Sequence, residues 1–488
     1  MASSSFNSAK CMKTLENSDA RVRAKVPDVS VDENSENKVD RISSLPDSVI
    51  CHILSFLPTK DAAATSMLST KWKHIFPLTP NLKLEFDDSG MRKDLFTSFV
   101  DRVLHVDLRD ATHVHAMKLW CRGEYKDRLK SWISAAVRLN VQSLDFKFLI
   151  QSPRWFANEI SKCTRLTTLK ITNSPICVLE SLSLPTLKVL NLEWVGLFNE
   201  TTISNLLSGC PVLEELIMVD CRVYAQTLSV CVPTLKRFTL QNCMHQDADN
   251  GFEEIKDFEV VIDTPGLEEL YYYDYHVAAR YTVCELMLLQ KARIDLKPDQ
   301  DQGGEEDSIS YNVNVAELVM TCLMTRCLFL SARTLQAVYC SGRLLTLFPN
   351  LVHLDLDLGV VCPRIWNLVI HILHCAPNLF TLGIEMGLRK YKECKKCDLA
   401  LVDWVPDCVA LCLRKISILA FTGTRQEFML LEYFLKHAKY LGQMVINIDS
   451  ELKREDQVSI EESFLKLPHS SKICQVVVKT SVGENGAK

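Results

Sequence analysis

Residues 185–192 read Pro-Thr-Leu-Lys-Val-Leu-Asn-Leu, and the pattern inside them, Leu-x-x-Leu-x-Leu, recurs along most of this chain. Copies that keep an apolar residue at all three positions begin at Leu166, Leu187, Leu213, Leu235, Leu267, Leu351 and Leu379, and a weaker copy begins at Val141. A proline stands two residues before six of the copies. Because proline lacks an N–H and holds its predecessor extended, it suits a turn that leads into a strand.

The spacing of the copies predicts a repeat architecture. Those at 166, 187, 213 and 235 start 21, 26 and 22 residues apart, close to the period of leucine-rich repeats. Alternate strand residues point the same way, so each Leu-x-Leu pair faces a core that only stacked repeats can bury. The ninth position holds Cys221 and Cys243 in two copies, but other copies depart from Asn or Cys, so the array is irregular. An ordinary α/β domain with leucine-rich strands is the alternative.

Composition limits the function classes. The chain has 488 residues, 47% of them apolar, and a net charge of −5, which argues against nucleic-acid binding. Twenty cysteines in a long chain without a secretory start indicate reduced thiols, and therefore an intracellular protein of the nucleus or cytoplasm. The apolar run Leu318–Leu330 is interrupted by Arg326 and is too short to span a membrane.

Composition also divides the chain into segments. Residues 1–38 are polar and are expected to form a disordered tail. We then expect a helical block over 39–81, repeats over 82–400 with an acidic loop at 299–307, a further unit over 401–450, and a C-terminal strand and tail over 451–488.

The helical block is predicted to contain three short helices. In the first, Val49, Ile50, Ile53, Leu54 and Leu57 form one apolar stripe, and Pro58 ends it. A second helix is expected to run to about Leu68, and a third to start near Ser69 and to carry Trp72. So small a core leaves apolar surface for a partner. Alternatively, the block only packs on the first repeat and caps it.

This block resembles the F-box of plant F-box proteins. The resemblance rests on Leu45-Pro46-Asp47, Ile53-Leu54, Leu57-Pro58, Leu68-Ser69 and Lys71-Trp72. It implies binding to a Skp-type adaptor, which joins F-box proteins to a cullin scaffold. Carried over by position, the residues that form or support the adaptor interface would be Leu45, Pro46, Ile50, Ile53, Leu54, Leu57, Pro58 and Trp72.

The C-terminal part resembles the FBD region that ends many plant F-box proteins with leucine-rich repeats. The matching segments include Trp404-Val405-Pro406-Asp407-Cys408 and Met444-Val-Ile-Asn-Ile448. The residues predict a strand over 413–420, a helix over 427–437 and a strand over 444–448. The expected fold is therefore α/β: a small three-helix F-box, then an irregular leucine-rich-repeat solenoid (horseshoe), ending in an FBD unit.

Other motifs give no catalytic or metal site. Cys394-Lys-Lys-Cys397 has metal-ligand spacing, but a structural zinc site needs four ligands, and Cys408 and Cys412 are spaced as i and i+4. Incidental thiols in an exposed loop are the favoured interpretation. His113 and His115 are expected on one face of a strand as a surface or packed pair. Phosphate-loop and hydrolase signatures are absent from the sequence, so we expect neither cofactor nor catalysis.

A non-catalytic receptor is therefore the leading hypothesis. In it, the F-box binds the adaptor and the repeats bind an unknown target protein, with no nucleic-acid or membrane partner. Outward strand positions that include Arg237, Tyr271 and Tyr273 combine a cation with aromatics, which is typical of a binding hot spot. A solvated face covered by a loop is the alternative. A non-degradative scaffold and a receptor gated by a small molecule remain open as other functions.

Overall fold

The computed structural model describes residues 41–79, 81–85, 93–111, 114–121, 126–148, 155–172, 182–197, 200–245, 257–275, 278–296, 305–343, 346–358, 365–386, 404–450, 452–464, 467, 470–471 and 473–480. The chain divides into two compact units, Met1–Pro46 and Asp47–Lys488. Described residues of the first unit form turns, in which the Leu45 N–H donates to the Ile42 carbonyl at 3.1 Å. All helices and strands below belong to the second unit.

The second unit alternates strands and helices along most of its length. Its helices are α1 (Asp47–Ser55), α2 (Thr59–Thr65), α3 (Thr70–Ile75), α4 (Lys93–Arg102), α5 (Lys126–Arg138), α6 (Trp155–Ile160), α7 (Glu200–Ser208), α8 (Glu305–Met320), α9 (Ala332–Cys340), α10 (Ile365–Cys375), α11 (Arg425–His437) and α12 (Arg454–Phe464). The strands of its main sheet are β1 (Asn81–Glu85), β2 (Ala116–Cys121), β3 (Ser143–Phe148), β4 (Thr168–Thr172), β5 (Val189–Glu193), β7 (Glu215–Val219), β10 (Arg237–Gln241), β13 (Glu269–Asp274), β15 (Lys291–Leu296), β16 (Cys327–Leu330), β17 (His353–Asp357), β18 (Thr381–Glu385), β19 (Lys415–Phe421), β20 (Gln443–Ile448) and β21 (Gln475–Thr480).

These fifteen strands form one parallel sheet in chain order. Each Leu-x-x-Leu-x-Leu copy supplies one strand, and the leucines align across neighbours, as where Leu190 of β5 lies beside Leu216 of β7. Leu190 and Leu216 are buried, as are the corresponding residues of the other copies. The repeat prediction is confirmed at the level of strands, register and core. The horseshoe shape stays a prediction.

The turns after three strands also repeat. Trp194, Asp220 and Asn242 directly follow β5, β7 and β10, and all three have a positive φ of about 50° (56°, 50° and 49°). After each of these residues comes a two-residue strand, and β6 (Gly196–Leu197), β8 (Arg222–Val223) and β11 (Met244–His245) pair into a small second sheet. Identical backbone conformations at equivalent positions show that the repeat extends beyond its leucines.

Polar residues between the proline and the leucine join consecutive repeats. The Thr186 hydroxyl donates to the Leu166 carbonyl at 2.9 Å, and the Thr234 hydroxyl donates to the Leu213 carbonyl at 2.8 Å. In later copies Asn replaces Thr: the Asn378 side-chain amide donates to the Pro349 carbonyl at 2.8 Å. The Pro-polar-Leu motif therefore places a side-chain donor where the preceding turn presents a carbonyl.

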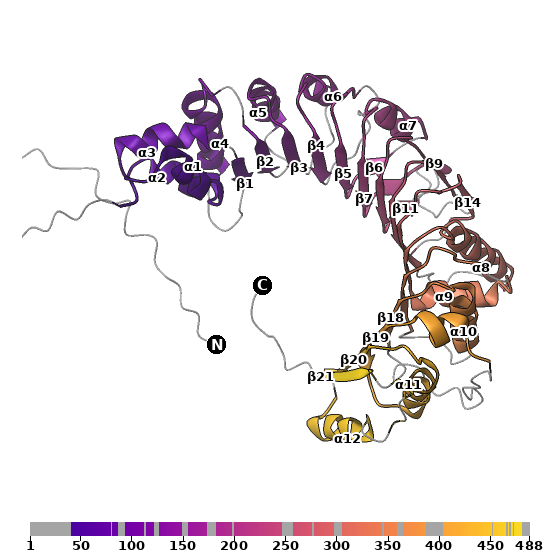
Figure 1. Cartoon of the computed structure of the whole chain (residues 1–488). Coiled ribbons are helices and arrows are strands. Elements are labelled where there is room, and N and C mark those ends of the chain that lie inside the picture. The colour runs from indigo at the N-terminus through magenta and orange to yellow at the C-terminus, as the bar shows by residue number, and fades with distance from the viewer. Residues whose placement is uncertain are drawn as a thin grey trace, which may run out of the picture. The chain divides into compact units, whose positions relative to one another are not determined.

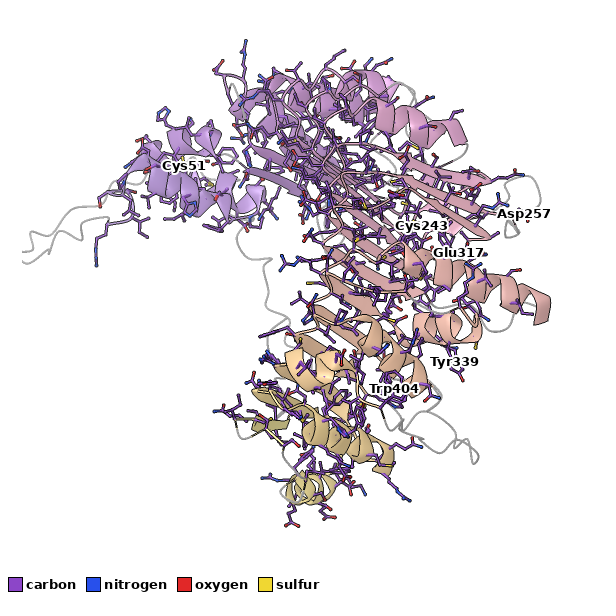
Figure 2. All side chains as sticks on the ribbon, turned by 45° about the vertical axis from the view of Figure 1, so that its right-hand side comes forward. Cys51, Cys243, Asp257, Glu317, Tyr339 and Trp404 are labelled. Carbon is purple, nitrogen blue, oxygen red and sulfur yellow. The ribbon has the colours of Figure 1, made fainter. Side chains whose placement is uncertain are left out.

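Helices lie on one side of the strand row (Figure 1), covering the inward leucines. Between α7 and α8, a three-stranded sheet covers the leucines in place of a helix. Its strands are β9 (Thr227–Cys231), β12 (Glu259–Asp263) and β14 (Arg280–Val283). Figure 2 shows Glu317 of α8 and Tyr339 of α9 on the helical side and Cys243 by the strands.

Several element predictions need correction. The acidic loop was expected over 299–307, but α8 begins at Glu305, so its last three residues are helical. The second helix ends at Thr65 rather than near Leu68. At this end, the Thr65 hydroxyl donates to the Ala62 carbonyl at 2.6 Å. Strands β15 and β16 were missed because Ala292 and Thr325 replace leucines of the pattern.

Some predictions fall outside the described residues. These are the tail at 1–38, positions 299–304 of the acidic loop, His113, the Cys394–Cys397 pair and the chain end after 480.

Candidate functional site

Helices α1, α2 and α3 pack around a small core. Ile50 and Leu54 of α1 are fully buried, as are Trp72 and Ile75 of α3. Ser69 begins α3 by accepting a hydrogen bond from the Trp72 N–H at 3.4 Å, and Lys71 pairs with Asp47 of α1 at 3.3 Å. The cap stabilises the start of α3, and the ion pair links α3 to α1 beside the buried tryptophan.

A second apolar stripe of α1 faces solvent. Val49 and Ile53 are spaced i and i+4, so they share one side of α1, and Phe56 directly follows the helix; all three are exposed, Phe56 by 69%. The residues predicted as one stripe therefore form two sets. Ile50 and Leu54 face the core, whereas Val49 and Ile53 are exposed, and Leu57 is half-buried. Met67 and Leu68, just after α2, add exposed apolar surface, 89% and 69% respectively.

The residues predicted for adaptor binding divide accordingly. Pro46, Ile53 and Pro58 are exposed, and Leu45 and Leu57 are half-buried. Ile50, Leu54 and Trp72 are buried, so they can support an interface but cannot touch a partner. Four further exposed apolar residues are not among those predicted for adaptor binding: Val49, which belongs only to the predicted stripe, Phe56, Met67 and Leu68. The i, i+4, i+7 spacing of Val49, Ile53 and Phe56 in the sequence could have indicated that these three residues form one exposed apolar set.

The helical block is joined to the first strand of the sheet. The Lys83 N–H of β1 donates to the Thr59 hydroxyl oxygen at 2.6 Å, and Thr59 is buried. The alternative to partner binding is that the helical block only packs on the first repeat and caps it. The structure shows that the block packs on the repeats with one side and exposes apolar side chains on the other.

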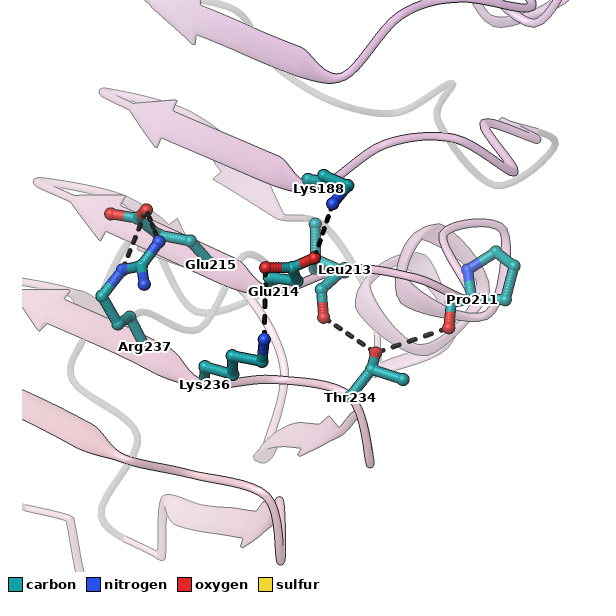
Figure 3. Close-up of polar contacts among 8 residues, drawn as sticks. All are labelled: Lys188, Pro211, Leu213, Glu214, Glu215, Thr234, Lys236 and Arg237. Atoms are coloured by element: carbon teal, nitrogen blue, oxygen red, sulfur yellow. Dashed lines mark hydrogen bonds and ion pairs between the residues drawn. The ribbon is translucent and has the colours of Figure 1, made fainter. Parts of the chain in front are cut away.

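The second candidate surface is the open face of the main sheet. We use this name for the strand positions that alternate with the buried leucines, most of which are exposed or half-buried. Ladders of charged pairs link neighbouring repeats (Figure 3). Directly before the strands, Glu214 accepts from Lys188 at 2.9 Å and from Lys236 at 3.5 Å, and on the face itself Arg237 of β10 donates to Glu215 of β7 at 2.7 Å. Neighbouring strands thus neutralise each other's charges.

The three residues predicted for target binding lie on adjacent strands of this face, β10 and β13. Glu215 holds Arg237 through two hydrogen bonds, of 2.7 and 3.1 Å, and raises the pKa of its guanidinium. The Tyr271 hydroxyl donates to Glu269 at 2.9 Å, and Tyr273 bonds to Tyr275 at 2.8 Å. Tyr272 points inward and is buried, as predicted from strand alternation. Arg237 is therefore engaged within the ladder, whereas the tyrosine rings remain partly accessible.

Buried thiols behave as core residues. Burial raises the pKa of Cys163 to about 11 and the pKa of Cys210, Cys322 and Cys408 to about 12. The Cys221 thiol donates to the Leu192 carbonyl of the preceding repeat at 3.4 Å. The four thiols with a raised pKa stay protonated near neutral pH and are poor nucleophiles.

Neither a metal-binding group of side chains nor a membrane-spanning helix is found among the described residues. Among those that the structure describes, no three His, Cys, Asp or Glu side chains are grouped to hold a metal ion. None of the described helices is both long and apolar enough to cross a membrane. His115 precedes β2 rather than lying in it, and its Nδ1 is 2.9 Å from Gln142 Oε1.

Comparisons with known proteins agree with this arrangement. The F-box domain model matches residues 42–82, and the model "FBD-associated F-box protein At5g56370, LRR repeats" matches residues 129–287. The FBD model matches residues 404–446. F-box/LRR-repeat protein At4g14096 of Arabidopsis thaliana is 32% identical over 481 residues, which cover 92% of this chain and 98% of that protein. The chain belongs to the plant F-box/LRR-repeat family.

Two further relatives also match most of this chain. F-box/LRR-repeat protein At4g14103 of Arabidopsis thaliana is 36% identical over 376 residues, 72% of this chain and 93% of that protein. Putative F-box/FBD/LRR-repeat protein At1g66290, from the same plant, is 28% identical over 475 residues, 95% of this chain and 99% of that protein. The predicted family resemblance is confirmed.

The FBD region of this F-box/LRR-repeat protein continues the repeat sheet. Its predicted strand, helix and strand correspond to β19, α11 and β20. Helix α11 begins with a capping box, in which Thr424 accepts from the Glu427 N–H and Glu427 accepts from the Thr424 N–H at 2.9 Å. Glu427 is fully buried, and burial raises the pKa of its carboxyl even though Thr422 and Thr424 donate to it.

Proposed function

We propose that this protein is the substrate-recognition subunit of a Skp–cullin–F-box ubiquitin ligase. The F-box would bind a Skp-type adaptor, the adaptor would join it to a cullin, and the open face would hold a target protein. The chain itself would perform no chemistry, since other subunits transfer ubiquitin and the receptor raises the local concentration of the target. Its place would be a reducing intracellular compartment, the nucleus or the cytoplasm.

The exposed stripe of α1 carries this proposal. Val49 and Ile53 lie on a short helix, α1, whose other side fills the core with Ile50 and Leu54, and Phe56 directly follows this helix. Contiguous apolar side chains that a fold does not use internally mark a protein interface. Of the residues suggested by the family resemblance, Pro46, Ile53 and Pro58 are exposed and would contact the adaptor, together with Val49, Phe56, Met67 and Leu68.

Co-purification with a Skp-type adaptor tests the F-box half of the proposal. We expect Ile53→Lys/Phe56→Lys to reduce adaptor binding by about a hundredfold or more, because two charges would be buried against apolar surface. Both side chains are exposed in the chain alone, so its fold should survive. The matched control is Met287→Lys/Leu288→Lys, which alters two exposed apolar residues before β15 in the same way.

The two double variants distinguish a specific adaptor interface from non-specific binding through exposed apolar side chains. Loss of binding by the α1 variant with retention by the control supports the adaptor interface. Equal binding by wild type and α1 variant, with both folded by circular dichroism, would contradict it.

The target half of the proposal concerns the open face. Arg237, Tyr271 and Tyr273 are the proposed target contacts, with the tyrosine rings as the more accessible part. Aromatic side chains supply large contact area at low entropic cost, which suits a recognition surface.

A further inference from the structure

The two end strands of the main sheet, β1 and β21, differ in what lies against their outer edges (Figure 1). At β1, the Thr59 hydroxyl accepts from the Lys83 N–H, so the F-box helices reach this edge. Strand β21 pairs with β20 on one side, and within the described residues no strand pairs with its other side. A strand edge without a partner presents a row of N–H and C=O groups that can pair with another chain.

Val476 and Val478 carry the outward backbone groups of β21. The Gln475 N–H donates to the Gly442 carbonyl at 2.9 Å, so the backbone groups of Gln475 face β20. These groups alternate from side to side along a strand, and those of Val476 and Val478 therefore face away from β20. The register with β20 is unbroken over all six residues of β21, so no bulge disturbs its outer edge.

The apolar core of the repeats is also incomplete at β21. Ile473, Val476 and Val478 continue the Leu-x-x-Leu-x-Leu pattern. In register, the two valines lie beside Met444 and Ile446 of β20, which are buried. The valines themselves are only half-buried, and Ile473 is exposed by 66%. The last repeat of an array exposes its apolar face unless something caps it.

The side chains of β21 suit a second copy of the same strand. Lys479 is the only charged residue of β21, and the strand contains no proline. Two identical edges related by a two-fold axis run antiparallel. With the axis at Val477, Lys479 of each copy stands opposite Gln475 of the other, so no like charges meet.

The same arrangement matches the backbone and the apolar side chains. Val476 of each copy stands opposite Val478 of the other, and the outward N–H and C=O groups of these residues face each other. Each of the two facing pairs can exchange two hydrogen bonds. All four valines then lie on the side of the joined sheet that the helices cover, where they extend the core. Residues 481–488, by comparison, supply one apolar side chain larger than alanine, Val482.

We propose that β21 pairs antiparallel with β21 of a second copy around a two-fold axis at Val477, so that the protein forms a dimer. Two-fold pairing uses the edge of each copy once, and assembly therefore stops at two. The inference does not rest on the proposed receptor function. Together with that function it would place two F-boxes and two open faces in one particle, which strengthens binding to a target that carries two recognised segments.

Sedimentation velocity of the full chain over a concentration series tests the inference. Wild type should form a reversible dimer with a dissociation constant on the order of 10 μM, because one pair of strands buries less area than a permanent dimer interface. Val477→Lys should weaken the dimer about tenfold or more, since two lysines would face each other across the axis. The matched control is Val445→Lys, at the partner position on β20, which is half-buried like Val477. It should dimerise like wild type.

A charge-pairing arm tests the register. Val477→Glu alone should be weakened like Val477→Lys, whereas an equimolar mixture of the two variants should restore a dimer, because lysine then faces glutamate across the axis. Restoration also shows that both variants are folded. In wild type, hydrogen–deuterium exchange of the peptide that contains Val476 and Val478 should slow as the concentration rises, and in Val477→Lys it should not.

Several results would overturn the inference. These are a wild type that stays monomeric over the whole series, a Val445→Lys control as weak as Val477→Lys, a variant mixture that stays monomeric, and species larger than a dimer. Co-purification with the adaptor on the same preparations separates this inference from the proposed function. A monomer that binds the adaptor leaves only the receptor proposal standing, and a dimer that does not bind it leaves only the dimer.

Discussion

Single residues at the junctions between repeats decide how closely the repeats approach. Gly209 follows α7, and its N–H donates to the Asn205 carbonyl while its own carbonyl accepts from the Leu184 N–H at 2.8 Å. A β-carbon at Gly209 would lie 1.9 Å from the Leu182 carbonyl oxygen. The side chain is absent because the backbone of the preceding turn occupies its place.

Gly209→Ala should therefore destabilise the protein by about 1–3 kcal/mol, the usual cost of overpacking against groups that cannot move away. Gly442→Ala is the control, because its β-carbon would meet the Arg414 carbonyl oxygen at an ordinary 3.6 Å. Urea unfolding of the two variants measures the difference. If Gly209→Ala proves as stable as Gly442→Ala, the close approach at this junction is wrong.

At the scale of elements, the start of α11 combines a helix cap with a buried acid. Glu427 accepts hydrogen bonds from the Thr422 N–H at 3.1 Å, the Thr424 N–H at 2.9 Å and the Thr422 hydroxyl at 3.0 Å. One carboxylate thus satisfies two backbone donors at the turn between β19 and α11. A buried polar group of this kind is tolerated only because its partners are complete.

Glu427→Ala should cost about 2–4 kcal/mol, since it leaves buried N–H groups without an acceptor and removes the capping box. Glu427→Gln keeps one acceptor oxygen and nearly the same volume, and should cost less than half as much. Thermal unfolding followed by circular dichroism ranks the variants. Equal losses would show that the acceptor role of Glu427 is unimportant.

At the scale of the whole second unit, the F-box helices and the repeat sheet are joined through β1. The Thr59 hydroxyl accepts from the Lys83 N–H, and both groups belong to the unit that runs from Asp47 to Lys488. Repeats are stabilised by their neighbours, so a terminal strand depends on what covers it. The F-box block thus contacts the first strand of the sheet, and in the proposed function it would also bind the adaptor.

Thr59→Val should destabilise the β1 end by about 1–3 kcal/mol, because the Lys83 N–H loses its acceptor. Native-state hydrogen exchange should show faster exchange at Lys83 with little change at β17 and β18. Thr70→Val, at the exposed start of α3, is the control. Unchanged exchange at Lys83 would indicate that the F-box and the sheet are not coupled through this bond.

The F-box and FBD regions were predicted from their resemblance to known families, and the strands with their inward leucines from the repeated pattern. The pattern works because it is local: Leu190 and Leu216 align because each repeat places its leucines at the same distance from its turn. Proline and threonine before Leu187 and Leu235 are equally local signals. The pattern does not reveal a strand where another residue replaces one of its leucines, as Ala292 does in β15.

Which residues of the α1 stripe are exposed depends on packing in three dimensions. Val49 and Ile50 adjoin in sequence and are both apolar, yet packing against α3 buries one and leaves the other exposed. Likewise, Arg237 is engaged by Glu215 on the neighbouring strand, whereas Asp357 stands beside the like charge of Glu385. Charges on different strands meet only through sheet register, which brings together residues that are more than twenty positions apart in the chain.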